Sequence, residues 1–186
     1  MTRPILAALC VASLAAPASA GEIGASLPDF SATALDGTHV SLVDATKTHK
    51  AVVVLFLSAF CPYANLFGGH IRQLVDTYGP RGVFFVGVVS NQFETVEDMT
   101  ESAREHGYAF PLVRDERAEI AARLGAGRTP EAFVVGADGR LRYHGWVQSK
   151  LRSPDLQRAL EAMLAGKRVR LAETRAFGCA IDRGQR

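Results

Sequence analysis

The sequence has few cysteines, and its acidic and basic residues nearly cancel. Three cysteines occur in 186 residues, and the formal net charge at pH 7 is +2. A protein that binds nucleic acid needs clustered cations for the phosphates. The only basic run, at 167–175, is modest and is more typical of a solvated surface. The charge pattern therefore argues against a nucleic-acid partner.

The chain also lacks an apolar run long enough to span a membrane. A transmembrane helix needs roughly 20 apolar residues, and the run from Ile5 to Ala16 is shorter. This run follows Arg3 and precedes Ala18-Ser19-Ala20, which is typical of a signal-peptide cleavage site. We interpret residues 1–20 as a cleaved signal peptide. We therefore predict export to the periplasm or the medium, and no stable membrane insertion.

Removal of the signal takes away Cys10 and leaves Cys61 and Cys179 in the mature chain. Disulfides persist in the oxidising compartments that exported proteins reach, but sequence alone does not show that these two cysteines pair. The five histidines have no metal-ligand spacing, and no phosphate-binding glycine loop is visible. We expect neither a metal site nor a cofactor.

The first half of the mature chain alternates strand and helix patterns. Asp36-Gly37 is a hairpin signal within 29–42. The continuous apolar runs 51–58 and 82–90 indicate strands that are buried on both faces. A helix pattern follows each run, one after Cys61 and one from Thr95.

The second half adds a hairpin and a last helix. The pattern predicts a strand at 110–115, a helix at 116–124, a hairpin at 131–146 and a helix from Ser153-Pro154 to Gly166. This order predicts an α/β sandwich with parallel central strands and antiparallel strands at one edge. We expect one domain at 21–166 and a tail at 167–186 that carries Cys179 and packs on the domain.

Cys61 stands between the first apolar strand and a helix pattern that begins with Pro62. Proline suits the first helical position, where its missing N–H costs nothing. The free N–H groups and the dipole at a helix start favour a thiolate. We therefore predict a reactive thiol. The competing interpretation is that Cys61 fills the core, since free cysteines are among the most buried residues.

Four stretches extend this interpretation over nearly the whole mature chain. They are "LPDFSATALDGTHVSL" at 27–42, "CPYAN" at 61–65, "GRTPEAFVVGADGRLRYHG" at 127–145 and "AFGCAIDR" at 176–183. The chain resembles the thioredoxin-fold redoxins, in the peroxiredoxin-like branch of alkyl hydroperoxide reductase and thiol-specific antioxidant relatives. The resemblance implies a thioredoxin-like three-layer α/β/α sandwich with a central mixed sheet and an N-terminal β-hairpin.

The resemblance also implies the site residues. Cys61 and Cys179 would be the catalytic cysteines, with Cys179 resolving or bridging the oxidised form of Cys61. Ser58, Thr129 and Pro130 would contact the substrate. In thioredoxin-like proteins a proline at this place is cis and lies against the reactive sulfur.

Two departures from the family patterns leave the substrate open. Ala64 replaces the second cysteine of Cys-x-x-Cys, and Val54 replaces the proline of the peroxiredoxin pattern. A protein disulfide or thiol and a peroxide both remain candidate substrates, with an unidentified thiol as reductant. Pairing of two copies through a sheet edge, as in many peroxiredoxins, also stays open.

We therefore expect an exported thiol-dependent oxidoreductase, acting as a thiol-disulfide oxidoreductase or as an antioxidant thiol peroxidase. The competing hypothesis is a redox-inert binding or scaffold module with a structural Cys61–Cys179 disulfide, because fold alone does not imply activity.

Overall fold

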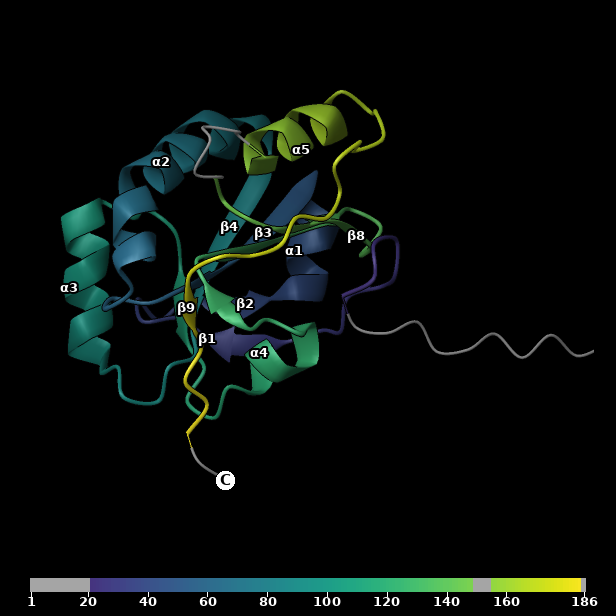
Figure 1. Ribbon diagram of the computed structural model, residues 1–186. Helices are drawn as coiled ribbons and strands as arrows, with labels where there is room; N and C mark the ends of the chain where they lie inside the picture. The colour runs from purple at the N-terminus through teal and green to yellow at the C-terminus, as the bar shows by residue number, and fades with distance from the viewer. Residues whose placement is uncertain (1–20, 149–154, 185–186) are drawn as a thin grey trace, which may run out of the picture.

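The computed structural model describes residues 21–148 and 155–184, so the predicted signal peptide and the predicted helix start at Ser153-Pro154 lie outside the described residues. A five-stranded mixed sheet forms the centre of the molecule (Figure 1). Its order is β5-β4-β3-β7-β8, with β5, β4 and β3 parallel and β7 and β8 antiparallel to their neighbours. The strands are β3 (Ala51–Leu57), β4 (Val83–Val89), β5 (Leu112–Arg114), β7 (Glu131–Gly136) and β8 (Leu141–Gly145).

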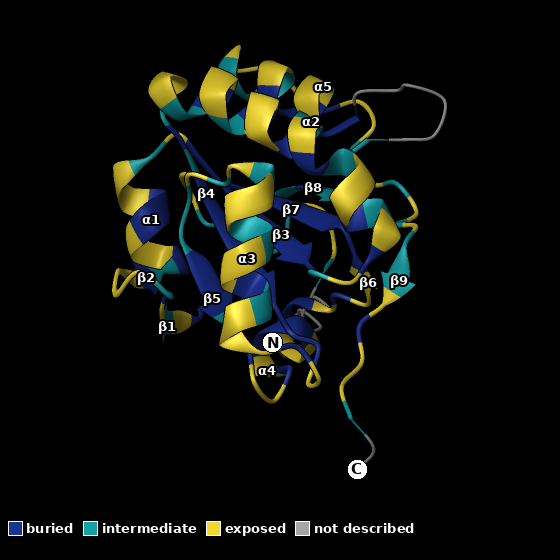
Figure 2. Ribbon diagram, turned by 90° about the vertical axis from the view of Figure 1, so that its left-hand side faces the viewer, coloured by how far each residue is buried: buried dark blue, intermediate teal, exposed yellow. Residues whose placement is uncertain are grey.

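Helices cover both faces of this sheet, and the expected three-layer thioredoxin-like sandwich is confirmed. They are α1 (Leu42–Thr48), α2 (Pro62–Tyr78), α3 (Val96–His106), α4 (Glu119–Leu124) and α5 (Asp155–Leu164), with a short 3-10 turn at Gly79–Arg81. Figure 2 shows the sheet buried between helices whose outer faces are exposed. No helix in the described part of the chain combines the length and the apolar character needed to cross a bilayer.

The alternation of side chains along β3 supplies both layers of the core. All seven residues of β3 are buried, and successive side chains of a strand point to opposite faces. Val53 and Leu55 pack in one hydrophobic cluster with residues of α2, α3 and α5. Val52 and Val54 pack in the other cluster with residues of α1 and α4. The continuous apolar run therefore indicated a central strand correctly.

The N-terminal hairpin is confirmed, with β1 (Ser31–Thr33) antiparallel to β2 (His39–Ser41). The helix that follows it, α1, was missed by the sequence analysis because it is short. Its signal was Ser41, whose hydroxyl caps the helix by accepting the Asp44 N–H at 3.1 Å.

One further helix begins later than expected. The predicted helix at 116–124 begins only at Glu119, because Asp115 accepts the N–H groups of Ile120 and Ala121 and so caps the helix later. Gly68-Gly69 does not interrupt α2. A Cβ atom at Gly68 would collide with the His106 ring, so this glycine lets α2 and α3 approach closely.

The chain after α5 returns across the molecule to the carboxyl end of β3. It runs beside β8, where the His144 N–H donates to Ala172 O at 2.9 Å. It then forms β9 (Cys179–Ala180), which pairs antiparallel with β6 (Arg128–Thr129). Figure 2 shows β9 beside β6 at the edge of the molecule. The tail thus reaches the region of Cys61.

Candidate functional site

Cys61 lies in the turn between β3 and α2, at the position that precedes the first helical residue. Pro62 occupies the first helical position, as the sequence predicted. The Cys61 side chain is only 1% exposed. Burial agrees with both interpretations of this cysteine, so its neighbours decide what the thiol does.

The first neighbour is the segment Thr129-Pro130, whose peptide bond is cis, as the resemblance implied. The Cys61 thiol donates a hydrogen bond to the Thr129 carbonyl oxygen, with a sulfur–oxygen distance of 3.0 Å. The Thr129 hydroxyl is buried and has no hydrogen-bond partner at normal geometry. It lies near enough to the sulfur to lower the pKa of Cys61.

The second neighbour is Cys179, which pairs directly with Thr129 across the β6–β9 ladder. Both cysteines are free thiols in the structure. The Cys179 thiol and the Cys179 backbone N–H lie near enough to the Cys61 sulfur to lower the pKa of Cys61. The tertiary structure therefore brings together Cys61, Thr129 and Cys179 from three distant parts of the sequence.

Gly178 permits this close approach of the tail. Its φ is +153°, and a Cβ atom there would collide with the Thr129 carbonyl group. Arg128 reinforces the contact, because its guanidinium donates to the Gly178 carbonyl oxygen at 3.0 Å. The glycine before Cys179 is thus required by the geometry of the strand pairing.

The two thiols have opposite pKa shifts. Burial would raise the pKa of Cys61, but hydrogen bonds from the Cys179 thiol, the Thr129 side chain and the N–H groups of Ala64 and Cys179 outweigh it and lower that pKa. Burial, together with the hydrogen bond and negative charge of Cys61, raises the pKa of Cys179 to about 11. Cys61 is therefore the more acidic thiol of the pair.

A scan against protein-family models matches residues 23–144 to the AhpC/TSA family. The chain belongs to the AhpC/TSA family. The structure of an uncharacterized conserved protein from Geobacillus kaustophilus is 30% identical, covers 87% of this chain and 92% of that protein, and has a TM-score of 0.80. The resemblance stated from the sequence is thus confirmed.

Curated relatives and more distant structures agree with this assignment. The thiol-disulfide oxidoreductase ResA of Bacillus anthracis is 25% identical over 120 residues, which are 64% of this chain and 67% of that protein. Peroxidoxin BcpB of Mycobacterium tuberculosis is 22% identical, covers 77% of this chain and 96% of that protein, and has a TM-score of 0.61, so it supports the fold alone. The family and the relatives confirm an oxidoreductase activity of the redoxin type.

Within this AhpC/TSA member, Ser58 is placed differently from the other predicted site residues. Its hydroxyl donates to the carboxylate of Glu94 at 2.5 Å, and both side chains are buried. Glu94 also accepts the Ala59 N–H at 2.7 Å and the side-chain amide of Asn91 at 2.5 Å. The structure gives the Ser58 hydroxyl a partner in this network, and its predicted contact with substrate stays a prediction.

Glu94 was missed by the sequence analysis, although a signal was available. It follows β4 at the same edge of the sheet where Cys61 follows β3, and the carboxyl ends of parallel strands meet at one edge. Asn91 links this network to the tail, because its side-chain oxygen accepts the Asp182 N–H at 2.7 Å. Glu94 and Asn91 therefore connect the turn before Cys61 with the segment after Cys179.

Glu131 supports the cis segment from the other side, and it too was missed. One carboxylate oxygen accepts the N–H groups of Gly127 at 2.8 Å and Arg128 at 2.9 Å. The other oxygen lies 2.6 Å from His144 Nε2. These contacts hold β6, the strand that carries Thr129, by its backbone.

Aromatic residues stand close to both cysteines in the sequence and pack against one another. Phe177 of the tail packs edge-on to Tyr63 of α2, with ring centroids 4.9 Å apart, and stacks on Trp146 at 5.2 Å. Phe60, beside Cys61, stacks with Phe93, and both are more than half exposed.

Within the described residues, no group of three or more His, Cys, Asp or Glu side chains could hold a metal ion.

Proposed function

We propose that this redoxin is an exported thiol-dependent oxidoreductase in which Cys61 and Cys179 alternate between two thiols and one intramolecular disulfide. The observation that carries the proposal is the pairing of Thr129 with Cys179, because it sets the tail thiol at the Cys61 sulfur. Forming the disulfide removes two electrons and two protons from the pair, and these reduce the oxidised substrate. Export rests on the signal pattern of residues 1–20.

Cys61 is the nucleophile in the oxidising half of this cycle. It is the more acidic thiol, and only a thiolate attacks efficiently. Because the docked tail leaves Cys61 only 1% exposed, a small oxidant suits this state better than a folded protein.

With a hydroperoxide, the Cys61 thiolate attacks one peroxide oxygen and the O–O bond breaks. One proton goes to the departing alkoxide or hydroxide, and Cys61 becomes a sulfenic acid. The Cys179 thiol then attacks the Cys61 sulfur, its proton leaves with the hydroxyl group as water, and the disulfide forms. The buried Thr129 hydroxyl has no hydrogen-bond partner and lies beside the sulfur, so it can donate to the incoming oxygen.

Cys179 receives the reductant in the second half of the cycle. Its side chain is partly exposed, whereas Cys61 is buried. An external thiolate therefore attacks the Cys179 sulfur and displaces Cys61, which leaves readily because its pKa is the lower one. A second external thiol then attacks the mixed disulfide, which restores the Cys179 thiol and releases the reductant as a disulfide.

Protein thiol-disulfide exchange is the second candidate, and the Thr129-Pro130 segment favours it because the Thr129 carbonyl lies against the Cys61 sulfur. In this case β9 would leave β6, and an extended segment of a client protein would pair with Thr129 in its place. The Cys61 thiolate would then attack a sulfur of the client disulfide. The similarity to ResA, which is named as a thiol-disulfide oxidoreductase, supports this alternative.

Intact mass of the purified mature protein tests the proposal, measured before and after reductant and followed by thiol alkylation and peptide mapping. We expect a reducible Cys61–Cys179 link that re-forms after one equivalent of hydrogen peroxide. A link that re-forms with a protein disulfide but not with peroxide would favour exchange. Two thiols unchanged by peroxide and by disulfides would contradict the proposal and favour the inert scaffold.

Single-cysteine variants identify the two roles. Cys179→Ser should accumulate a sulfenic acid on Cys61 with peroxide, whereas Cys61→Ser should leave Cys179 unoxidised under the same conditions. In the oxidised wild-type protein, a brief pulse of small thiol quenched by acid should give a mixed disulfide on Cys179. A mixed disulfide found only on Cys61 would contradict the assigned direction of attack.

A further inference from the structure

A cavity of about 630 Å³ lies at the opposite end of the sheet from Cys61. It is bordered by Lys50, which precedes β3, by the turn between β7 and β8, and by the loop 166–172 that follows α5. Cys61 follows the other end of β3, and a strand rises about 3.3 Å per residue. The cavity is therefore separated from the redox site by roughly the length of this strand, on the order of 20 Å.

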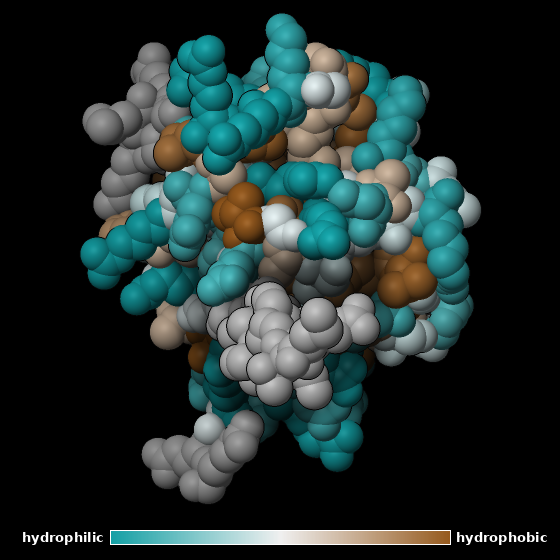
Figure 3. Space-filling model, turned by 90° about the vertical axis from the view of Figure 1, so that its right-hand side faces the viewer, coloured by the Kyte–Doolittle hydropathy of each residue, from teal (hydrophilic) through white to brown (hydrophobic). Residues whose placement is uncertain are grey.

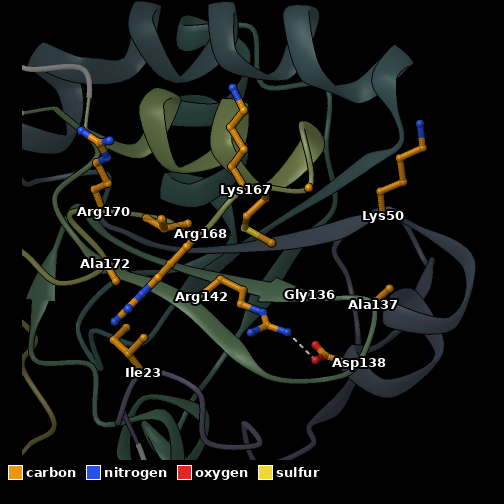
Figure 4. A pocket seen from close by; sticks show the side chains of 13 residues that line it. Ile23, Lys50, Gly136, Ala137, Asp138, Arg142, Lys167, Arg168, Arg170 and Ala172 are labelled. Carbon is orange, nitrogen blue, oxygen red and sulfur yellow. Dashed lines mark hydrogen bonds and ion pairs between the residues drawn. The ribbon is translucent and has the colours of Figure 1, made fainter.

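Basic side chains surround this cavity. Figure 4 shows Lys167, Lys50, Arg170, Arg168 and Arg142 on several sides of the hollow. Asp138 is the one acidic residue in the lining, and it forms an ion pair with Arg142. Within the described residues, no ion pair joins the other four cations to a carboxylate. Like charges around a concave surface raise the local positive potential and attract anions.

The loop that carries three of these cations is held at both ends. At its start, the Lys167 N–H donates to Ala162 O at 2.8 Å, just after the end of α5. At its end, Ala172 O accepts the His144 N–H of β8 at 2.9 Å. The backbone is thus fixed while the long side chains of Lys167, Arg168 and Arg170 remain exposed. A charged ligand could therefore bind without rearrangement of this backbone.

Part of the cavity wall is apolar. Ile23, Met163, Val169 and Ala172 contribute to the lining, and Val169 is buried. Figure 3 shows the side of the molecule on which the loop after α5 lies, where hydrophilic groups prevail and smaller apolar areas lie between them. The volume lies in the range of small-molecule sites and is well above that of a simple inorganic anion.

We propose that this cavity binds an anion that carries a phosphate group and an apolar portion. A soluble phosphate ester and the headgroup of an anionic phospholipid share this chemistry, so the experiment treats them separately. The site is independent of the cysteine chemistry, and titration of Cys61→Ser alongside the wild type separates the two proposals.

The soluble arm is calorimetric titration with inorganic phosphate and with naphthyl phosphate. We expect naphthyl phosphate to bind more tightly than inorganic phosphate of similar charge, because its ring meets the apolar wall. The lipid arm is co-sedimentation with vesicles of phosphatidylglycerol, compared with vesicles of phosphatidylcholine. Binding confined to the phosphatidylglycerol vesicles would identify a lipid headgroup, and binding of the soluble phosphates would identify a free ester.

The double variant Arg168→Gln/Arg170→Gln should weaken binding about tenfold, since exposed charge contacts each contribute up to about 1 kcal/mol. Arg72→Gln/Arg117→Gln is the matched control, because it removes the same charge from exposed sites outside the cavity. It should change affinity by less than about twofold. Equal weakening in both double variants, or no binding of any of these probes, would overturn the proposal.

Discussion

Cys179 lies opposite Thr129 in the antiparallel pair of β6 and β9, and the carbonyl of that same Thr129 accepts the Cys61 thiol. One residue of the cis segment therefore contacts both cysteines. A free strand edge can pair with an extended partner, and here the chain's own tail pairs with β6. The tail supplies donors that lower the pKa of the buried Cys61 thiol.

Replacing Gly178 with alanine should displace the tail from β6. The new Cβ atom would collide with the Thr129 carbonyl group, and the φ of +153° is unfavourable for alanine. We expect faster alkylation of Cys61 by a bulky maleimide. Gly166→Ala is the matched control, because Gly166 has a positive φ of +65° but open space around its Cβ position. Equal labelling of Cys61 in Gly178→Ala and the wild type would show that the tail does not cover the thiol.

Removing the tail thiol should raise the pKa of Cys61. Cys179→Ala deletes the side-chain donor to the Cys61 sulfur but keeps the Cys179 N–H. The pH dependence of iodoacetamide labelling at Cys61 should therefore shift to higher pH. Cys179→Ser, which retains a hydroxyl donor, should shift it less. A profile that moves to lower pH would show that the tail thiol does not stabilise the Cys61 thiolate.

Ser58→Ala should destabilise the fold by about 1.5–3 kcal/mol, the usual range for a hydrogen bond to a charged group. The serine hydroxyl donates to the buried Glu94 carboxylate at 2.5 Å, and alanine leaves that oxygen with one donor fewer. Urea unfolding measures the loss. Ser31→Ala, which removes an exposed hydroxyl near His39, should change stability by less than about 0.5 kcal/mol. A similarly small loss at Ser58 would contradict the role of this network in holding the turn before Cys61.

Glu161→Gln should weaken the contact between α2 and α5 in a pH-dependent manner. Hydrogen bonds from Arg81 and then from Tyr78 lower the pKa of Glu161 to about 2. Because its folded-state pKa lies below the ordinary value of 4.5, its contribution is present above that value and is lost as the pH falls toward about 2.

Screening by solvent limits this contribution to less than about 1 kcal/mol, since the side chains of both partners are nearly half exposed. Unfolding free energies of the wild type and Glu161→Gln should therefore differ at pH 7 and converge near pH 2. Glu116→Gln, an exposed glutamate in the loop before α4, serves as the control. A difference that stays constant over this pH range would show that the carboxylate is not responsible.

The sequence predicted the arrangement of the sheet because its signals are local. A buried strand such as 51–57 requires a continuous apolar run, and a helix start requires residues such as Thr95 or Pro62 within one turn. The sequence predicted short elements less accurately. Helix α1 and the start of α4 each depend on the cap at a single residue, Ser41 or Asp115.

The sequence by itself determined the sandwich, the position of Cys61 before Pro62, and the family to which the tail motif Gly178-Cys179 points. Only the tertiary structure decided that Thr129 and Cys179 pair, that Glu94 holds Ser58, and that Cys61 is the more acidic thiol. These facts depend on contacts between residues that are far apart in the sequence. Ser58 and Glu94 are 36 positions apart, and Cys61 and Thr129 are 68 positions apart. Local patterns of hydrophobicity and capping carry no information about which distant donors reach one sulfur, and the pKa of that sulfur depends on those donors.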